Sequence, residues 1–410
     1  MLAELRKVRF PVETGLLLAF CLFLPLLEFW KNFALLAFLF AWVVNRLRAR
    51  DFGGPWRTSD SVALLWIVAA YLAAAFAGLD GRAWAKTGDV AASALLFWMV
   101  ARAGYAEREQ RWLLVTLVLS TLAGLAIGYW RLWSGEGKSG NLQLYSVGHV
   151  NHTAIYIAIM LGVCASGLFA GWRSWPAARR GLALAASALV FASLVVTASR
   201  AAVGIGLALV LALSLAWWPR WRAPLAASLA VVALTAAALY GFGAEVVRKQ
   251  MENAAAQNVL SFRDGVWRTG LAGWQKYPWF GVGKDNYGLI TQERVRAWRT
   301  EAGEPYDAAE YFPSSHGHSL YFTTLAERGL VGFAALAAVL LASLAALVRW
   351  RPRPGDADLA CVLWGGAASA WFVTAGVGAV NTTLHHEHGL LAALLFGLWL
   401  STLRRRPGSA

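Results

Sequence analysis

Charged residues are scarce in this sequence. They make up only 15% of its 410 residues, whereas 58% are hydrophobic. A soluble domain of this length needs far more polar residues to cover its surface, so the composition excludes a cytosolic enzyme, a secreted domain and a disordered chain. The apolar runs are also too long for an outer-membrane barrel, whose strands alternate over about ten residues. The sequence therefore predicts an all-α polytopic membrane protein.

Cysteine is rare too, and motifs for nucleotide binding are missing. The cysteines Cys21, Cys164 and Cys361 lie in apolar runs, without the spacing of a disulfide framework or a metal site. No Walker A sequence and no paired glycine-rich loop occurs, so we expect no cofactor and a substrate that arrives already activated. The net charge of +14 comes mostly from short loops between apolar runs, so we expect membrane lipids rather than nucleic acid as partners.

About twelve apolar runs are long enough to predict membrane-spanning helices. They lie at 14–29, 31–45, 61–79, 87–103, 112–133, 153–171, 181–198, 201–218, 224–243, 320–348, 359–379 and 387–403. The first run follows basic residues, as in a signal peptide, but no small-residue cleavage site follows it, so we expect it to be retained. We divide the chain into spans one to nine at 1–243, a long polar loop at 244–319, and spans ten to twelve with the tail at 320–410.

The basic residues predict the orientation of these helices, because positive charge gathers in cytoplasmic loops. Arginines mark the N-terminal segment, every second loop and the C-terminal segment, as at Arg46, Arg102 and Arg404. We therefore predict that both termini are cytoplasmic and that the loop at 244–319 lies on the other side of the membrane. The tryptophans and tyrosines of this loop indicate helices at the membrane surface, and a loop of this length is usually functional.

Histidine placement points to a site on the same side as the long loop. All seven histidines fall on that predicted side: His149, His152, His316, His318, His385, His386 and His388. They could cap helix ends, form a metal site, or supply an acid or base near neutral pH. The segment His385-His386-x-His388 lacks the helical i, i+4 zinc spacing, so we predict no metal site. For His318 we favour the acid or base role.

Three arginines are candidates for binding an anion. Arg200 stands between two apolar runs with almost no loop, where it either snorkels to the interface or binds phosphate through its guanidinium. Arg263 and Arg268 lie in the long loop, where they form either a solvated basic face or, with Arg200, a clamp for a diphosphate at the membrane surface.

Three short elements resemble the O-antigen ligase/polymerase family. His318-Ser319, nine further residues and the Gly-Leu-Val-Gly at 329–332 resemble the His-[Asn/Ser/Gln]-x9-Gly-x-x-Gly pattern of O-antigen ligases. The Thr-Ala-Ser-Arg at 197–200 resembles the family's Ser-Arg element. Arg263-x3-Trp267 with the segment at 277–283 resembles its Arg-x3-Trp…His-Pro-Leu-x-Gly-x-Gly element, with Tyr277 in place of the usual His. The resemblance covers roughly residues 185–335.

The resemblance implies an inverting, metal-independent glycosyltransferase of the membrane-embedded, GT-C-like kind. Such an enzyme moves a glycan from undecaprenyl diphosphate to the lipid A–core oligosaccharide, at the periplasmic face of the bacterial inner membrane, in lipopolysaccharide biosynthesis. By this resemblance, His318 is the base, and Arg200 and Arg263 stabilise the departing diphosphate. The expected substrate-binding residues are Arg268, His316, Ser319 and Trp267.

Other functions remain open from the sequence. An O-antigen polymerase would transfer the glycan to another lipid-linked repeat, although the His-x9-Gly pattern favours the ligase. A protein O-oligosaccharyltransferase would use a pilin Ser or Thr, but these relatives often carry an extra C-terminal region, which we do not expect here. A lipid or anion transporter would place charged pairs in broken central helices, whereas here charge and histidine gather at one membrane face.

Overall fold

The protein is built from helices. A computed structural model describes residues 8–136, 141–217, 263–353 and 356–404, together with positions 226, 229, 230 and 233. Every regular element in these ranges is helical, which confirms the predicted all-α fold. The first half contains α2 (Pro11–Phe23), α3 (Glu28–Ala49), α4 (Thr58–Ala75), α5 (Ala83–Ala103), α6 (Glu107–Trp133), α7 (Val150–Gly171), α8 (Ala177–Val196) and α9 (Arg200–Trp217). The second half contains α12 (Arg263–Lys276), α13 (Gln292–Glu301), α14 (Leu320–Arg349), α15 (Asp358–Gly378) and α16 (His386–Arg404).

The apolar helices follow the predicted spans. A helix occurs at each predicted span except 224–243, of which only four positions are described. Within the described residues, seven helices are long and apolar enough to cross a membrane, namely α3, α4, α6, α7, α8, α14 and α15. Shorter apolar helices occur at Pro11–Phe23 and Arg200–Ala216. The chain is therefore a polytopic membrane protein, while the count of twelve spans stays a prediction.

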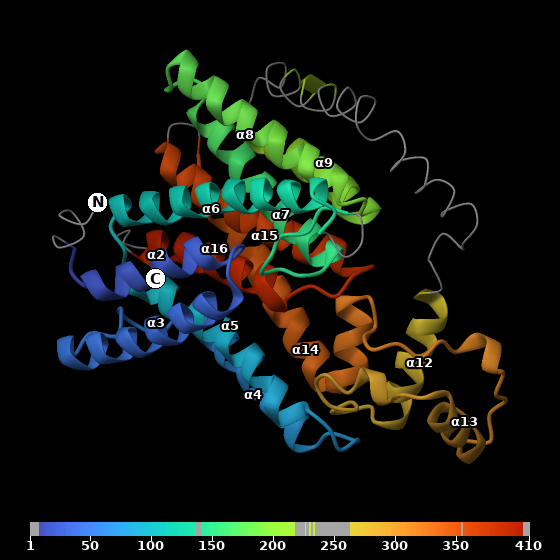
Figure 1. The fold of residues 1–410 in the computed structure, drawn as a ribbon. Helices are drawn as coiled ribbons and strands as arrows, with labels where there is room; N and C mark the ends of the chain where they lie inside the picture. The colour runs from blue at the N-terminus through green and yellow to red at the C-terminus, as the bar shows by residue number, and fades with distance from the viewer. Residues whose placement is uncertain are drawn as a thin grey trace.

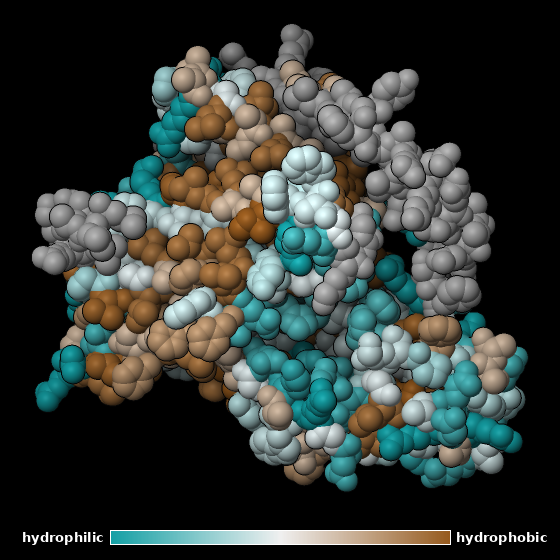
Figure 2. Space-filling model, viewed as in Figure 1, coloured by the Kyte–Doolittle hydropathy of each residue, from teal (hydrophilic) through white to brown (hydrophobic). Residues whose placement is uncertain are grey.

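Helix α7 is the centre of the bundle. Its sequence is apolar on all sides, and a helix of this kind is stable only when it is surrounded. Accordingly, 89% of the residues in its most apolar 18-residue stretch are buried. The helix contacts α8, α9, α15 and α16. Figure 1 shows α7 between α6 and α15 in the middle of the bundle. The outer helices expose apolar side chains, and Figure 2 shows hydrophobic residues over this part of the surface.

A smaller unit of α12, α13 and their connecting segments packs near one end of α14 (Figure 1). It has its own core, in which Tyr287, Ile290 and Val295 are fully buried. Its surface is largely hydrophilic, in contrast to the surface of the bundle (Figure 2). The residues that were predicted to form a long loop thus fold, where the structure describes them, into two α-helices and two short 3₁₀ turns.

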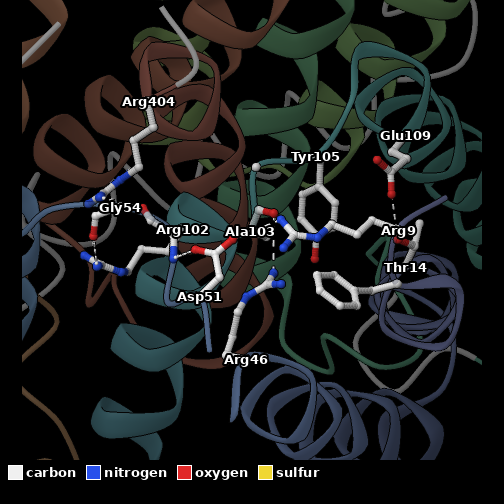
Figure 3. Close-up of a pocket in the computed structure, with 13 residues that line it drawn as sticks. Arg9, Thr14, Arg46, Asp51, Gly54, Arg102, Ala103, Tyr105, Glu109 and Arg404 are labelled. Atoms are coloured by element: carbon white, nitrogen blue, oxygen red, sulfur yellow. Dashed lines mark hydrogen bonds and ion pairs between the residues drawn. The ribbon is translucent and has the colours of Figure 1, made fainter. Parts of the chain in front are cut away.

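The basic end of the bundle is held by buried ion pairs. Arg46 pairs with Glu13 at 3.1 Å, and Arg102 and Arg404 each approach Asp60 at 2.7 Å. Figure 3 shows these arginines around a cavity of about 290 Å³. Because each guanidinium already has a carboxylate partner, we interpret this cavity as structural. Arg9 pairs with Asp51 here too, so both ends of the described chain lie at the same end of the bundle.

Candidate active site

Three predicted catalytic residues stand at the beginnings of three helices. Arg200 is the first residue of α9, Arg263 is the first residue of α12, and His318 lies two residues before α14. They are electrostatic neighbours: the charge of Arg200 acts on Arg263, and the charge of Arg263 acts on His318. The N-termini of α9 and α14 carry unpaired N–H groups and a partial positive charge, so this arrangement favours an anion.

The two arginines form an electropositive pair. Burial, and secondarily the Arg200 guanidinium, lower the pKa of Arg263 from its ordinary value. Within the described ranges, no carboxylate forms an ion pair with Arg200 or Arg263. Two like charges without a counter-ion are costly to hold together, and a bound anion would relieve this cost.

His318 is neutral and has a free ring nitrogen. Burial, and then the charges of the neighbouring His316, Arg263 and His149 in that order, lower its pKa to about 4. Its Nδ1 is buried and has no hydrogen-bond partner in the described part of the chain. The backbone of His318 adopts a left-handed conformation, with φ of 45°, which is uncommon outside glycine and often occurs at functional positions.

The segment that carries His316 and His318 is fixed by two predicted substrate-binding residues. The Trp267 indole donates a hydrogen bond to the carbonyl oxygen of Gly317 at 3.0 Å, and it stacks on Phe322 with ring centroids 4.9 Å apart. Ser319 is fully buried, caps α14, and donates from its hydroxyl to the Gly378 carbonyl at 3.2 Å. These contacts indicate that Trp267 and Ser319 position His318.

Two other predicted residues have separate surroundings. Arg268 forms an ion pair with Glu310 at 3.1 Å, and both side chains are about half exposed, so it is not drawn into the pair formed by Arg200 and Arg263. His316 stands beside His318, with ring centroids 4.0 Å apart, and shares a hydrogen bond with the Ser315 hydroxyl at 3.0 Å. Burial, and then the charges of His149, His386 and Lys284, lower the pKa of His316.

The remaining histidines join the same region. His149 and His152 at the start of α7 have ring centroids 5.4 Å apart, and His152 in turn contacts His385, His386 and His388 around the start of α16. His149 also acts electrostatically on His316 and His318. All seven histidines, from three distant segments, therefore gather in one cluster. They lie at the opposite end of α16 from Arg404 and its ion pairs.

Sequence reasoning missed most of the charged residues that surround this cluster. Lys284 pairs with the buried Glu327 of α14 at 3.2 Å and acts on His316. Lys31 forms a buried ion pair with Glu387, and the Ser146 hydroxyl donates to the same carboxylate at 3.4 Å. The only sequence signals for Lys31 and Glu387 were a charge at the edge of an apolar run and a carboxylate among histidines.

The glycines of two sequence elements have a common structural purpose. Helix α14 is broken at Gly329, with φ of 60° and ψ of −160°. The backbone groups around this break form hydrogen bonds with the segment at 277–283. The N–H groups of Val282 and Gly283 donate to the carbonyl oxygens of Ala326 and Glu327, and those of Leu330 and Val331 donate to Pro278 and Trp279. A Cβ atom at Gly281 or Gly329 would lie within 2.6 Å of facing backbone atoms. Both glycines are needed for this close approach.

Tyr277 departs from the family pattern but has a clear packing role. Its ring meets the Trp298 ring at nearly a right angle, with centroids 5.9 Å apart. It also covers Gly78, where any Cβ would lie 2.2 Å from the Tyr277 ring. The aromatic ring thus joins the smaller unit to the connection between α4 and α5.

Comparison with known proteins identifies the family of this region. Residues 185–337 match the family described as O-antigen ligase. The match begins in α8 and ends in α14, so it includes Arg200, Arg263 and His318. No curated protein matches the chain. Residues 185–337, which carry Arg200, Arg263 and His318, are therefore similar to the O-antigen ligase family.

Proposed function

We propose that this protein is an O-antigen ligase of the bacterial inner membrane. It transfers a glycan from undecaprenyl diphosphate to a hydroxyl of the lipid A–core oligosaccharide, at the periplasmic face, with inversion at the anomeric carbon. The observation that carries the proposal is the electrostatic proximity of Arg200, Arg263 and His318, from the segments that lead into α9, α12 and α14. The reaction needs cations that stabilise the anionic leaving group and a base that accepts the hydroxyl proton.

In the proposed step, the acceptor hydroxyl oxygen attacks the anomeric carbon from the face opposite the diphosphate. The bond between the anomeric carbon and the diphosphate oxygen breaks, and its electron pair stays on the diphosphate. The hydroxyl proton passes to His318. One bond forms and one breaks on opposite faces of the same carbon, so the configuration at that carbon inverts.

Arg200 and Arg263 stabilise the charge that develops on the diphosphate. Fixed cations aimed at developing charge are among the largest contributions to catalysis. No carboxylate among the described residues pairs with either arginine, which supports a role for both in binding the leaving group. A guanidinium also binds phosphate oxygens in a bidentate manner. We propose that this arginine pair replaces a metal ion in the transfer step.

His318 accepts the proton because it is neutral and has a free nitrogen. A pKa of about 4 makes it a weak base in the free enzyme, and a general base is most effective near the working pH. A bound diphosphate brings negative charge beside His318 and raises its pKa. Donor binding would thus activate the base only when there is a glycan to transfer.

A single assay separates this proposal from its rivals. Purified full-length protein receives undecaprenyl-diphosphate glycan and, in parallel reactions, lipid A–core, additional lipid-linked repeat, or pilin. A shifted lipid A–core band is the expected product. Lengthened lipid-linked glycan would show a polymerase instead, and glycosylated pilin a protein O-oligosaccharyltransferase. Absence of product with every acceptor would contradict the proposal and favour a transporter.

A further inference from the structure

Three histidines from two helices lie close enough to share a ligand. His152 is in the first turn of α7, His385 directly precedes α16, and His386 is the first residue of α16. One ring nitrogen from each lies within 4.8 Å of those of the other two. The ring centroid of His152 lies 4.7 Å from that of His385 and 4.9 Å from that of His386.

A fourth histidine is buried beside them and lacks a partner. His388 is only 1% exposed, and its Nε2 has no hydrogen-bond partner among the described residues. Its ring centroid is 5.4 Å from that of His152 and 5.0 Å from that of His385. A buried polar atom without a partner is costly, and such atoms in native structures call for an explanation.

The surroundings of His385 resemble those of a metal ligand. Its Nε2 faces the Thr382 carbonyl oxygen at 2.9 Å, so Nε2 carries the proton and Nδ1 keeps a free lone pair. Metal-binding histidines usually donate their other ring N–H to a carbonyl or carboxylate in this way. The backbone is also strained here, because Leu384 and His386 both adopt left-handed conformations, with φ of 59° and 49°.

We propose that His152, His385 and His386 bind a divalent transition-metal ion, with His388 as the fourth ligand. Imidazole nitrogens favour Zn²⁺, Ni²⁺, Cu²⁺ and Co²⁺ over Mg²⁺ or Ca²⁺. Tetrahedral zinc with Zn–N bonds of about 2.0–2.1 Å holds its nitrogens about 3.4 Å apart. The three nitrogens would therefore draw together by up to about 1.4 Å on binding, a change within reach of side-chain rotation.

The spacing along the chain had argued against a metal, because His385, His386 and His388 do not share the i, i+4 pattern. The structure adds His152 from α7, which no spacing rule could place beside them. Two lysines near the site could repel a bound cation, but both are neutralised by ion pairs. Lys284 pairs with Glu327, and Lys31 pairs with Glu387. The carboxylates of Glu387 and Asp89 act favourably on a positive charge at His386.

The proposed ion joins α7 to α16 and braces the wall of the histidine cluster. It takes no part in the transfer step, which uses Arg200, Arg263 and His318. The site is thus additional to the proposed function, and metal binding can be measured without glycan donor or acceptor. Failure of either proposal leaves the other unaffected.

The test uses full-length protein in detergent, stripped with EDTA, desalted and titrated with Co²⁺ and then Zn²⁺. We expect one ion per chain and the visible absorption spectrum of four-coordinate Co²⁺ with nitrogen ligands. His152→Ala and His388→Ala should each weaken Zn²⁺ binding at least about 100-fold, since even loss of a group that only orients a ligand costs about 10- to 100-fold. His316→Ala is the matched control, because it removes a histidine of the same cluster and should bind Zn²⁺ as the wild type does.

Three results would overturn the proposal: no stoichiometric binding by the wild type, a six-coordinate Co²⁺ spectrum, or equal loss of binding in His316→Ala. Poorly folded variants do not weaken the test, because the stoichiometry and spectrum come from the wild type. Thermal unfolding adds an independent check, since a ligand that binds only the folded state raises the melting temperature. Zn²⁺ should raise it for the wild type and His316→Ala but not for His152→Ala.

Discussion

Replacing Gly329 with alanine tests whether the break in α14 builds the site. Gly329 has φ of 60° and ψ of −160°, a region open almost only to glycine, and a side chain there costs about 1–3 kcal/mol in backbone strain. The new Cβ would also lie 2.4 Å from the carbonyl carbon and oxygen of Trp279. Relief of this clash breaks the bonds from Leu330 to Pro278 and from Val331 to Trp279, worth about 0.5–1.5 kcal/mol each.

The combined loss is about 2–6 kcal/mol, a large share of the roughly 5–15 kcal/mol that stabilises a typical domain. We therefore expect Gly329→Ala to lower the melting temperature of the purified protein, followed by tryptophan fluorescence, and to abolish glycan transfer. Gly204→Ala in α9 is the matched control: its Cβ would meet nothing within 4 Å, and alanine favours a helix. A Gly329→Ala protein as stable as the wild type would refute this account of the break.

Three further predictions concern the site. Arg263→Lys keeps the charge but loses the planar guanidinium, so its kcat should fall by roughly 10²-fold in the lipid A–core assay. The exposed Arg296→Lys is the control and should keep the wild-type kcat. If Arg263→Lys is as fast as the wild type, Arg263 is structural. Trp267→Phe keeps the stacking on Phe322 but loses the hydrogen bond to Gly317, so kcat should fall by roughly 2- to 10-fold and stability by about 0.5–1.5 kcal/mol. A larger fall in kcat for Trp267→Leu would confirm that the stacking contributes. Because His318 has a pKa of about 4 in the free enzyme, kcat/KM should stay level from pH 7 to about 5 and decline toward pH 4, and an acid limb near 6.5 would contradict this.

The lowered pKa of His318 also links stability to pH. The unfolded chain binds the proton at about pH 6.5, whereas the folded chain binds it only at about 4. Between these values the unfolded state holds more protons, so the contribution of His318 to stability is complete above about 6.5 and is lost as the pH falls toward 4. His316 adds to this loss, because its pKa is lowered as well.

The sequence predicted the elements that depend on local composition. Apolar runs predicted the bundle helices because a membrane span needs only length and hydrophobicity. The positive-inside rule placed Arg46, Arg102 and Arg404 at one end, where the structure pairs Arg46 with Glu13 and both other arginines with Asp60. The histidines were expected on one side, and they do gather. Whether this end faces the periplasm stays a prediction.

The contacts that complete the site could not be predicted, because they join distant segments. Nothing in the sequence places His152 beside His385, or Lys284 beside Glu327. Residue type alone suggested that Trp267 and Ser319 bind substrate, but their partners are the Gly317 and Gly378 carbonyls. The purpose of the glycines at 281 and 329 likewise became clear only from the two chain segments that meet there.

The most direct test of the central claim is the single-turnover rate of glycan transfer to lipid A–core by His318→Ala, measured beside the wild type. A general base contributes about 10²- to 10⁴-fold to the rate. The account predicts a slowing in this range, at an unchanged melting temperature and unchanged donor affinity. A His318→Ala protein that transfers glycan at the wild-type rate would show that His318 is not the base, and would contradict the mechanism proposed here.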